Sequence, residues 1–207
     1  MERRLARAWF ARPALDVAPE LLGRVLARRS PEGRVLRVRI VETEAYEPGD
    51  PASHGFRGPT RRNASMFGPP GHLYVYFVYG MHFCANIVTG GIGEGSAVLL
   101  RAGEPLEGID EMRTLRGGGR ARDLCRGPAR LAQAMALDRS LDGADLVRGR
   151  AVWIEPGEAL DRARVTTGPR IGVRRGMDRA WRFFETGSPW VSPRARATTA
   201  GEEGLRA

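Results

Sequence analysis

The clearest pattern of apolar and polar positions along the chain is an alternation that begins at residue 34. In the segment RVLRVRIVETEAYEPGD, every second residue from 36 to 40 is apolar, and the other face carries Arg37, Arg39 and Thr43. The apolar positions are Leu36, Val38 and Ile40. Such a period of two predicts a half-buried β-strand. Continued by three steps, the same face carries Glu42, Glu44 and Tyr46, so two carboxylates and a tyrosine are expected at the end of a buried face.

Glycine and proline divide the rest of the chain into short elements. Residues 14–29 are expected to begin as a short helix with Pro19 in its first turn and to continue as a strand at 25–29. A long loop is expected over residues 48–71. Strands are predicted at 74–79 and 83–89, joined by a short turn, and at 97–105, with further candidates at 151–155 and 169–175. Helices are predicted at 107–116 and at 127–138, with Pro128 at the first position of the latter.

Strands and helices are intermixed without a regular βαβ period, which favours a single α+β domain with a mostly antiparallel sheet. The domain is expected to span residues 1–193. Residues 194–207 have no apolar pattern, and a disordered tail is expected there.

The net charge of the chain indicates what kind of partner it binds. The formal net charge of the 207 residues is +9, which indicates a polyanion such as nucleic acid. All 33 basic residues are arginine. A GC-rich genome explains arginine in place of lysine, but it does not explain the excess of 33 basic over 24 acidic residues. The missing lysines also leave only the N-terminal amine for Schiff-base chemistry.

The sequence favours a cytoplasmic protein that does not enter a membrane. It contains two cysteines, Cys84 and Cys125, which is too few for a disulfide framework. No apolar run approaches the length of a membrane helix, and the N-terminal segment lacks the features of a secretory signal.

Four polar residues on the predicted strands are candidates for chemistry. Desolvation raises the pKa of a carboxyl group, so Glu44, with its neighbour Glu42, is a candidate general base; the alternative is structural pairing with arginine. Arg101 follows the apolar run VLL and must have a partner, either Glu44 or Glu42. The pair could be a structural salt bridge or could hold a water molecule. Asn86 interrupts the segment FCANIVT, where an apolar residue is typical. It is either a residue of the site or a core amide whose hydrogen bonds are satisfied.

Several other site classes are excluded by spacing. The three histidines and two cysteines show no metal-binding spacing, so neither a metal nor a zinc deaminase is expected. No phosphate-binding loop or nucleophile elbow occurs, and GGIGEG lacks the helix that a dinucleotide fold requires.

Taken together, the sequence motifs of this chain resemble those of the alkyladenine (3-methyladenine) DNA glycosylases of the mammalian type. The matching stretches occur in the order of that family, from about residue 11 to 192. They are ARPALDVAPELLG, VETEAY, SHG, MFGPPGHLYVYFVYGMHFCANI, VLLRAGEPLEG, LCRGPARLAQAMALD, PRIGV and GSPWVS. The resemblance implies a curved antiparallel sheet flanked by helices and a monomer that needs no cofactor. It also implies a partner, double-stranded DNA containing damaged purines, and an activity, hydrolysis of the N-glycosidic bond of a flipped nucleotide without lyase activity.

The resemblance also assigns residues. Glu44 matches the general base, and Arg101 and the backbone carbonyl of Val173 match the groups that hold the attacking water. The pocket for the flipped base is formed by Tyr46, His54, Tyr76 and Asn86. Tyr79 matches the side chain that intercalates into the vacated stack, and further DNA contacts are expected from Met81, His82 and Arg126. The implied substrates are 3-methyladenine, 7-methylguanine, hypoxanthine and ethenoadenine.

Two other functions fit part of the pattern. A non-catalytic domain could stack single-stranded nucleic acid on its tyrosines, but the two glutamates would then have no purpose. A hydrolase of small nucleosides would not need the positive charge. The dependence of binding on salt separates these possibilities from a duplex-binding enzyme.

Overall fold

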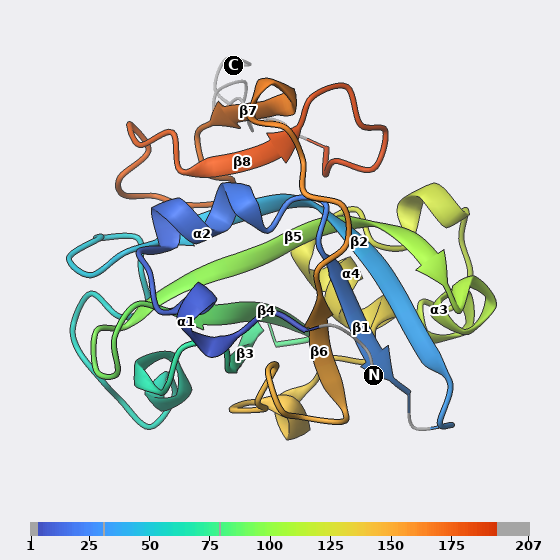
Figure 1. Ribbon diagram of the computed structural model, residues 1–207, viewed down its shortest axis with the longest axis horizontal. Coiled ribbons are helices and arrows are strands. Elements are labelled where there is room, and N and C mark those ends of the chain that lie inside the picture. Colours follow the sequence, from blue (N-terminus) through green and yellow to red (C-terminus); the bar gives the residue numbers. More distant parts are fainter. Residues whose placement is uncertain (1–3, 31, 79, 194–207) are drawn as a thin grey trace, which may run out of the picture.

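The alternating segment forms the longest shared ladder of the sheet. The computed structural model describes residues 4–30, 32–78 and 80–193, and in it β2 (Val35–Tyr46) pairs along one edge with β5 (Ser96–Glu107). Its other edge pairs first with β1 (Val25–Arg29) and then with β8 (Arg182–Glu185). Both long strands cross the middle of the molecule in Figure 1, with β8 and β7 (Val165–Gly168) above them. β2 is therefore the strand that joins all parts of the sheet.

The sheet order is β3-β4-β5-β2-β1-β6, and β8 pairs with both β2 and β7. Its remaining strands are β3 (Leu73–Val78), β4 (His82–Thr89) and β6 (Val152–Glu155). Every named pair is antiparallel. The predicted α+β class with a curved antiparallel sheet is thus confirmed.

Short helices cover this sheet (Figure 1). They are α1 (Arg7–Phe10), α2 (Ala14–Glu20), α3 (Ile109–Leu115) and α4 (Pro128–Ala134), with 3-10 turns η1 (Ala64–Phe67), η2 (Ala121–Asp123), η3 (Arg139–Leu141) and η4 (Arg162–Arg164). Pro128 begins α4, as predicted. Pro19, however, lies near the end of α2 rather than in its first turn, because the helix starts directly after the extended residue Pro13. The proline is tolerated there since it removes at most one internal hydrogen bond.

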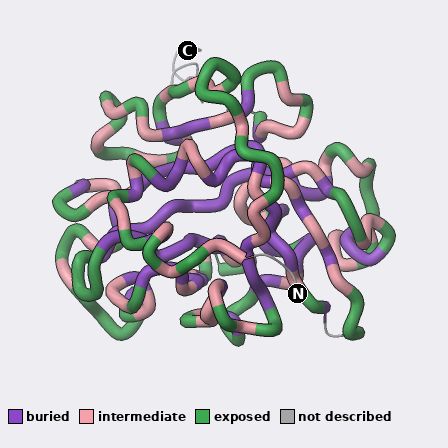
Figure 2. Tube along the Cα trace, in the orientation of Figure 1, coloured by how far each residue is buried: buried purple, intermediate pink, exposed green. Residues whose placement is uncertain are grey.

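One large apolar cluster holds the helices against the sheet. It includes Val17 and Leu21 of the α2 region, Leu131 of α4, and Val38 and Ile40 of β2, all at most 1% exposed. Figure 2 shows the buried residues along the central strands and the exposed ones in the surrounding loops. None of the helices in the described part of the chain has the length and apolar character needed to cross a bilayer.

The predicted continuity of the buried face along β2 is wrong. The register with β5 shifts between Ile40 and Glu42 and again between Glu42 and Thr43. Beyond these irregularities Ala45, not Glu44, joins the apolar cluster, and Thr43 donates a hydrogen bond to the carbonyl of Ala18 in α2. Because a bulge adds a residue to one strand, it exchanges the two faces. The glutamates and Tyr46 therefore share a face, as expected, but it is the face opposite the main core.

Two further predicted segments differ. Residues 169–175 form no strand; they connect β7 to the segment before β8. The second strand of the hairpin begins at His82, which pairs with Val78, so this histidine belongs to β4 rather than to the turn. The tail predicted at 194–207 lies outside the described residues.

Candidate active site

Glu44 is a fully buried carboxylate with three hydrogen-bond or ion-pair partners. Its Oε1 atom lies 3.0 Å from Nη1 of Arg101 and accepts a 2.8 Å hydrogen bond from the backbone N–H of Ile171. Its Oε2 atom accepts one 2.8 Å hydrogen bond, from the hydroxyl of Tyr46. A carboxylate has about four acceptor positions. Among the described residues, Oε2 therefore retains an acceptor position for one more proton donor.

Glu42 is equally buried, but it accepts four hydrogen bonds. Its Oε1 atom accepts hydrogen bonds from Nε of Arg101 at 3.0 Å, Nε of Arg182 at 2.6 Å and the hydroxyl of Ser192 at 2.8 Å. Its Oε2 atom accepts the backbone N–H of Ser192 at 2.7 Å. Of the groups that hold Glu42, only Arg101 lines the large cavity described below. The sequence left open which glutamate pairs with Arg101; the structure shows that both do.

Burial and charge set the protonation states around Glu44. Burial alone lowers the pKa of Arg101, but Glu44 and Glu42 outweigh it and raise the pKa above its ordinary value. Burial, and then the charge of Glu44, raises the pKa of Tyr46 well above its ordinary value. Tyr46 therefore keeps its proton and donates a hydrogen bond to Glu44.

The three partners of Glu44 all line one cavity of about 510 Å³. The cavity lies between the loop that carries Pro51 and His54 and the loop of residues 171–175. Tyr76, Val173 and His82 line it as well. Glu44 itself lies behind this wall. A molecule in the cavity would thus contact groups that hold the carboxylate.

The predicted base-binding residues are brought together from strands β2, β3 and β4 and from the loop that follows β2. Tyr46, His54, Tyr76 and Asn86 line a smaller adjoining hollow of about 50 Å³. The ring of His54 stands edge-on to that of Tyr76, with centroids 4.5 Å apart. Asn86 is buried and donates a hydrogen bond to the carbonyl of Tyr74. The amide is therefore held in place, and the hollow is lined mainly by aromatic rings.

His54 has one ring nitrogen engaged. Its Nδ1 atom lies 2.9 Å from the hydroxyl of Tyr74, whose pKa is raised to about 12, mainly by burial. Partial burial, and then the charge of Arg62, lowers the pKa of His54 below its ordinary value. The imidazole is therefore neutral near pH 7, and Nε2 remains for a further hydrogen bond.

The lowered pKa of His54 predicts a pH dependence of stability. On acidification the unfolded chain takes up the proton first, so the folded state loses stability as pH falls from about 6.5 toward the lower pKa of the folded protein. A His54→Asn variant lacks this contribution. We expect the Tm of wild type to decrease relative to that of the variant between about pH 7.5 and pH 5.5 in thermal unfolding. A relative gain by wild type on acidification would contradict the assignment.

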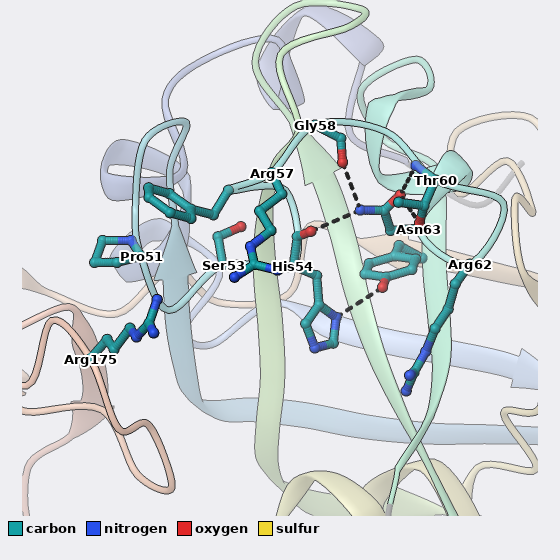
Figure 3. Close-up of a pocket in the computed structure, with 11 residues that line it drawn as sticks. Pro51, Ser53, His54, Arg57, Gly58, Thr60, Arg62, Asn63 and Arg175 are labelled. Carbon is teal, nitrogen blue, oxygen red and sulfur yellow. Dashed lines mark hydrogen bonds between the residues drawn. The ribbon is translucent and has the colours of Figure 1, made fainter.

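A second hollow of about 430 Å³ adjoins the cavity on the other side of His54 (Figure 3). Arg57, Arg62 and Arg175 line it, and in the close-up Arg57 lies above His54 while Arg62 and Arg175 lie on opposite sides of the view. None of the three has a carboxylate within ion-pair distance among the described residues, and Arg62 donates to the carbonyl of Phe77. Buried Asn63 braces the loop by donating to the carbonyls of His54 and Gly58. The opening thus presents uncompensated positive charge.

The residues predicted to contact DNA outside the pocket differ in exposure and in their present partners. Met81 is 70% exposed beside the hairpin turn, and His82 lines the cavity. Arg126 is half-buried and already donates to the carbonyl of Val191 and to Asp123. Tyr79 lies outside the described residues. Within the described chain, no three potential metal ligands are grouped.

The sequence reasoning missed the donors that fix the two glutamates. Ile171 acts through its backbone, which leaves no trace in a side-chain pattern. Ser192 lies in GSPWVS, a motif that matched without an assigned role, and Arg182 is the first residue of β8. The available signal for Arg182 was an arginine within the aromatic run WRFF.

The model of the family described as methylpurine-DNA glycosylase (MPG) matches residues 8–189. A protein of Carboxydothermus hydrogenoformans named "Putative 3-methyladenine DNA glycosylase" is 49% identical over 188 residues, which are 91% of this chain and 98% of that protein. Relatives of the same name are 51% identical in Streptomyces avermitilis, over 91% of each chain, and 53% identical in Burkholderia lata, over 91% of this chain and 90% of that protein. As its motifs predicted, the chain belongs to the methylpurine-DNA glycosylase family.

Proposed function

We propose that this glycosylase flips alkylated or deaminated purines out of duplex DNA and hydrolyses the N-glycosidic bond with a water molecule activated by Glu44. The observation that carries the proposal is the buried Glu44 carboxylate, whose three partners, Tyr46, Arg101 and Ile171, all line the cavity. The substrates are 3-methyladenine, 7-methylguanine, hypoxanthine and ethenoadenine. Membership of the glycosylase family favours an enzyme over a non-catalytic domain that stacks single-stranded nucleic acid on its tyrosines.

The walls of the cavity suit an extruded base. Tyr46 and Tyr76 stack on the base, and the neutral His54 donates a hydrogen bond to its edge. Stacking contributes about 1–3 kcal/mol per aromatic ring, which offsets the few kcal/mol that flipping costs. The fixed amide of Asn86 in the small hollow leaves no room for the exocyclic amino group of a normal guanine. Tyr79 fills the gap in the stack, and Met81, His82 and Arg126 contact the DNA nearby.

The chemistry follows from the free acceptor position of Glu44. Water held by Arg101 and the carbonyl of Val173 gives a proton to Oε2, and its oxygen bonds to C1′ of the sugar as the bond to the base breaks. The transition state resembles an oxocarbenium ion, which a nearby carboxylate stabilises. A cationic alkylated purine leaves as the neutral base. A neutral lesion such as hypoxanthine leaves as an anion, which the proton taken up by Glu44 neutralises after transfer through water. Without a lysine for a Schiff base, the product is an intact abasic site.

The positive opening suits the phosphate backbone of a duplex. Arg57, Arg62 and Arg175 lie beside His54, so phosphates that flank the flipped nucleotide would meet unpaired guanidinium groups. The protein acts as a monomer in the cytoplasm.

A panel of duplexes, each with one of the four lesions, tests the proposal by measuring free base. We expect release from the lesion-bearing duplexes, none from an undamaged duplex, and affinity that falls steeply as salt rises. Release from free nucleosides at the same rate, without dependence on salt, would instead identify a nucleoside hydrolase.

A further inference from the structure

A buried ion pair between Arg170 and Asp50 lies behind the candidate active site. Both side chains are fully buried. The guanidinium donates to both carboxylate oxygens of Asp50, through Nη1 and through Nη2, the latter at 3.0 Å. Asp50 lies in the loop that carries His54, and Arg170 lies in the loop that carries Ile171. The pair therefore joins the two loops that form opposite sides of the cavity.

The same guanidinium also touches the strand that carries Glu44. Its Nη1 atom donates a 3.0 Å hydrogen bond to the backbone carbonyl of Ala45, between Glu44 and Tyr46. Its central carbon lies 4.7 Å from the centroid of the Tyr46 ring, a distance typical of a cation–π contact. The residue after Arg170 donates its N–H to Glu44. Two of the three groups that hold the carboxylate, Tyr46 and Ile171, are thus directly fixed by Arg170.

The loop around Arg170 leaves it little freedom. Its Nη2 atom lies 3.5 Å from the carbonyl of Gly176, whose φ of +59° is a left-handed conformation. A Cβ atom at Gly176 would lie 3.1 Å from Nη2 of Arg170 and 3.3 Å from the carboxylate of Asp50. The turn thus lies directly over the ion pair. Glycine suits position 176 because it adopts the positive φ readily and has no Cβ atom to crowd the two side chains.

We propose that Arg170 is a positioning residue that holds Tyr46 and the N–H of Ile171 against Glu44 and so fixes the carboxylate for attack by water. A buried ion pair is weak evidence for stability, because apolar replacements are often no less stable. If Arg170 holds the groups around Glu44 in position, its contacts to Ala45, Tyr46 and Asp50 are all explained. The inference rests on the proposed role of Glu44.

Arg179 provides a matched control. It also reaches Asp50, at 3.4 Å, and lies over the ring of Trp181, which Arg170 contacts from 5.1 Å. Among the described residues, Arg179 contacts neither the Tyr46 ring nor the Ala45 carbonyl, and its side chain is 32% exposed. Loss of Arg179 therefore removes charge from Asp50 without releasing the groups around Glu44.

The test separates the chemical step from binding. Single-turnover release of hypoxanthine is measured at saturating enzyme, and Kd is measured on a duplex whose lesion carries a 2′-fluoro sugar, which resists cleavage. We expect Arg170→Met to lower the rate about 10–100-fold with Kd changed less than about threefold, since small misplacements of reacting groups are costly. Arg170→Lys, which keeps the charge, should recover part of the rate. Arg179→Met should stay within about threefold of wild type.

Each other result has a defined meaning. A wild-type rate in Arg170→Met would overturn the inference, and so would equal losses of rate and affinity in Arg170→Met and Arg179→Met, which indicate a structural role. If Arg170→Met does not fold, Arg170→Lys decides: a lower rate at unchanged Kd supports positioning, and a wild-type rate rejects it. Glu44→Gln is measured alongside. If it cleaves normally, the proposed function of Glu44 fails; if it is inactive while Arg170→Met is not, only the inference about Arg170 fails.

Discussion

Replacement of Glu44 by glutamine is expected to reduce the single-turnover rate of base release about 10²- to 10⁴-fold, the usual contribution of a general base. Glutamine has the same shape but cannot accept the proton of the attacking water. Its carbonyl oxygen can still accept from Arg101 and Ile171, and its amide can donate to the hydroxyl of Tyr46, which also serves as an acceptor. The variant should therefore fold and bind lesion-bearing duplex. Rapid-quench assays of free base, together with binding to the same duplex, measure both quantities.

Glu47 supplies the control for this prediction. It lies three residues further along and accepts hydrogen bonds from the N–H of Leu15 and, at 3.4 Å, from the hydroxyl of Ser96. Glu47 is not among the residues that line the cavity. Glu47→Gln should therefore cleave at nearly the wild-type rate. If Glu44→Gln also did so, Glu44 would not be the general base.

Replacement of Glu42 by glutamine is expected to act on stability instead. Glu42 pairs with Arg101 and Arg182, both at most 5% exposed. Arg101 keeps Glu44 when Glu42 is replaced, but Arg182 loses the carboxylate that the described residues offer it, so a buried positive charge is left without compensation. Removal of one partner from a buried pair typically costs about 3–5 kcal/mol. For a domain of this size each kcal/mol lowers Tm by about 2–4 °C. Denaturant unfolding monitored by tryptophan fluorescence gives the free energy directly.

The matched comparison is Glu104→Gln. Glu104 pairs with Arg39 at 2.7 Å, but its side chain is 29% exposed, and solvent weakens such pairs to about 1 kcal/mol or less. A loss for Glu42→Gln no greater than for Glu104→Gln would show that the buried network contributes little. A variant of Glu42 that stays fully stable yet loses only the chemical step would exchange the roles assigned to the two glutamates.

Much of the site could be predicted from the sequence because its signals are local. The alternation around Leu36 and Val38 indicated the central strand, and the VETEAY motif indicated where its carboxylates would lie. The ordered motifs indicated the family, and with it the residues that gather at the cavity. The turn residues indicated the hairpin and the start of α4. Each of these depends on spacing within a few residues, which the chain carries wherever it folds.

What the sequence could not supply depends on partners that are distant in the chain. The edge of β2 that faces away from β5 pairs with β1 up to Arg39 and with β8 from Glu42 onward, and β8 lies about 140 residues further along the chain. The register shifts between Ile40 and Thr43 place the glutamates on the face opposite the main core. The segment at 169–175 was predicted as a strand from its composition. In the fold, its Ile171 N–H bonds to a carboxylate instead of to a neighbouring strand.

The sequence by itself thus determined the fold class, the family and several polar side chains of the site, among them Glu44, Arg101 and His54. The tertiary structure alone decided which glutamate is held by groups that all line the cavity and which is held mainly by groups away from it. It also decided which arginine bridges the loops on either side. The physical reason is that burial and hydrogen-bond satisfaction are properties of an enclosed volume. That volume is closed here by segments near residues 45, 101, 171 and 192, whose meeting no local pattern specifies.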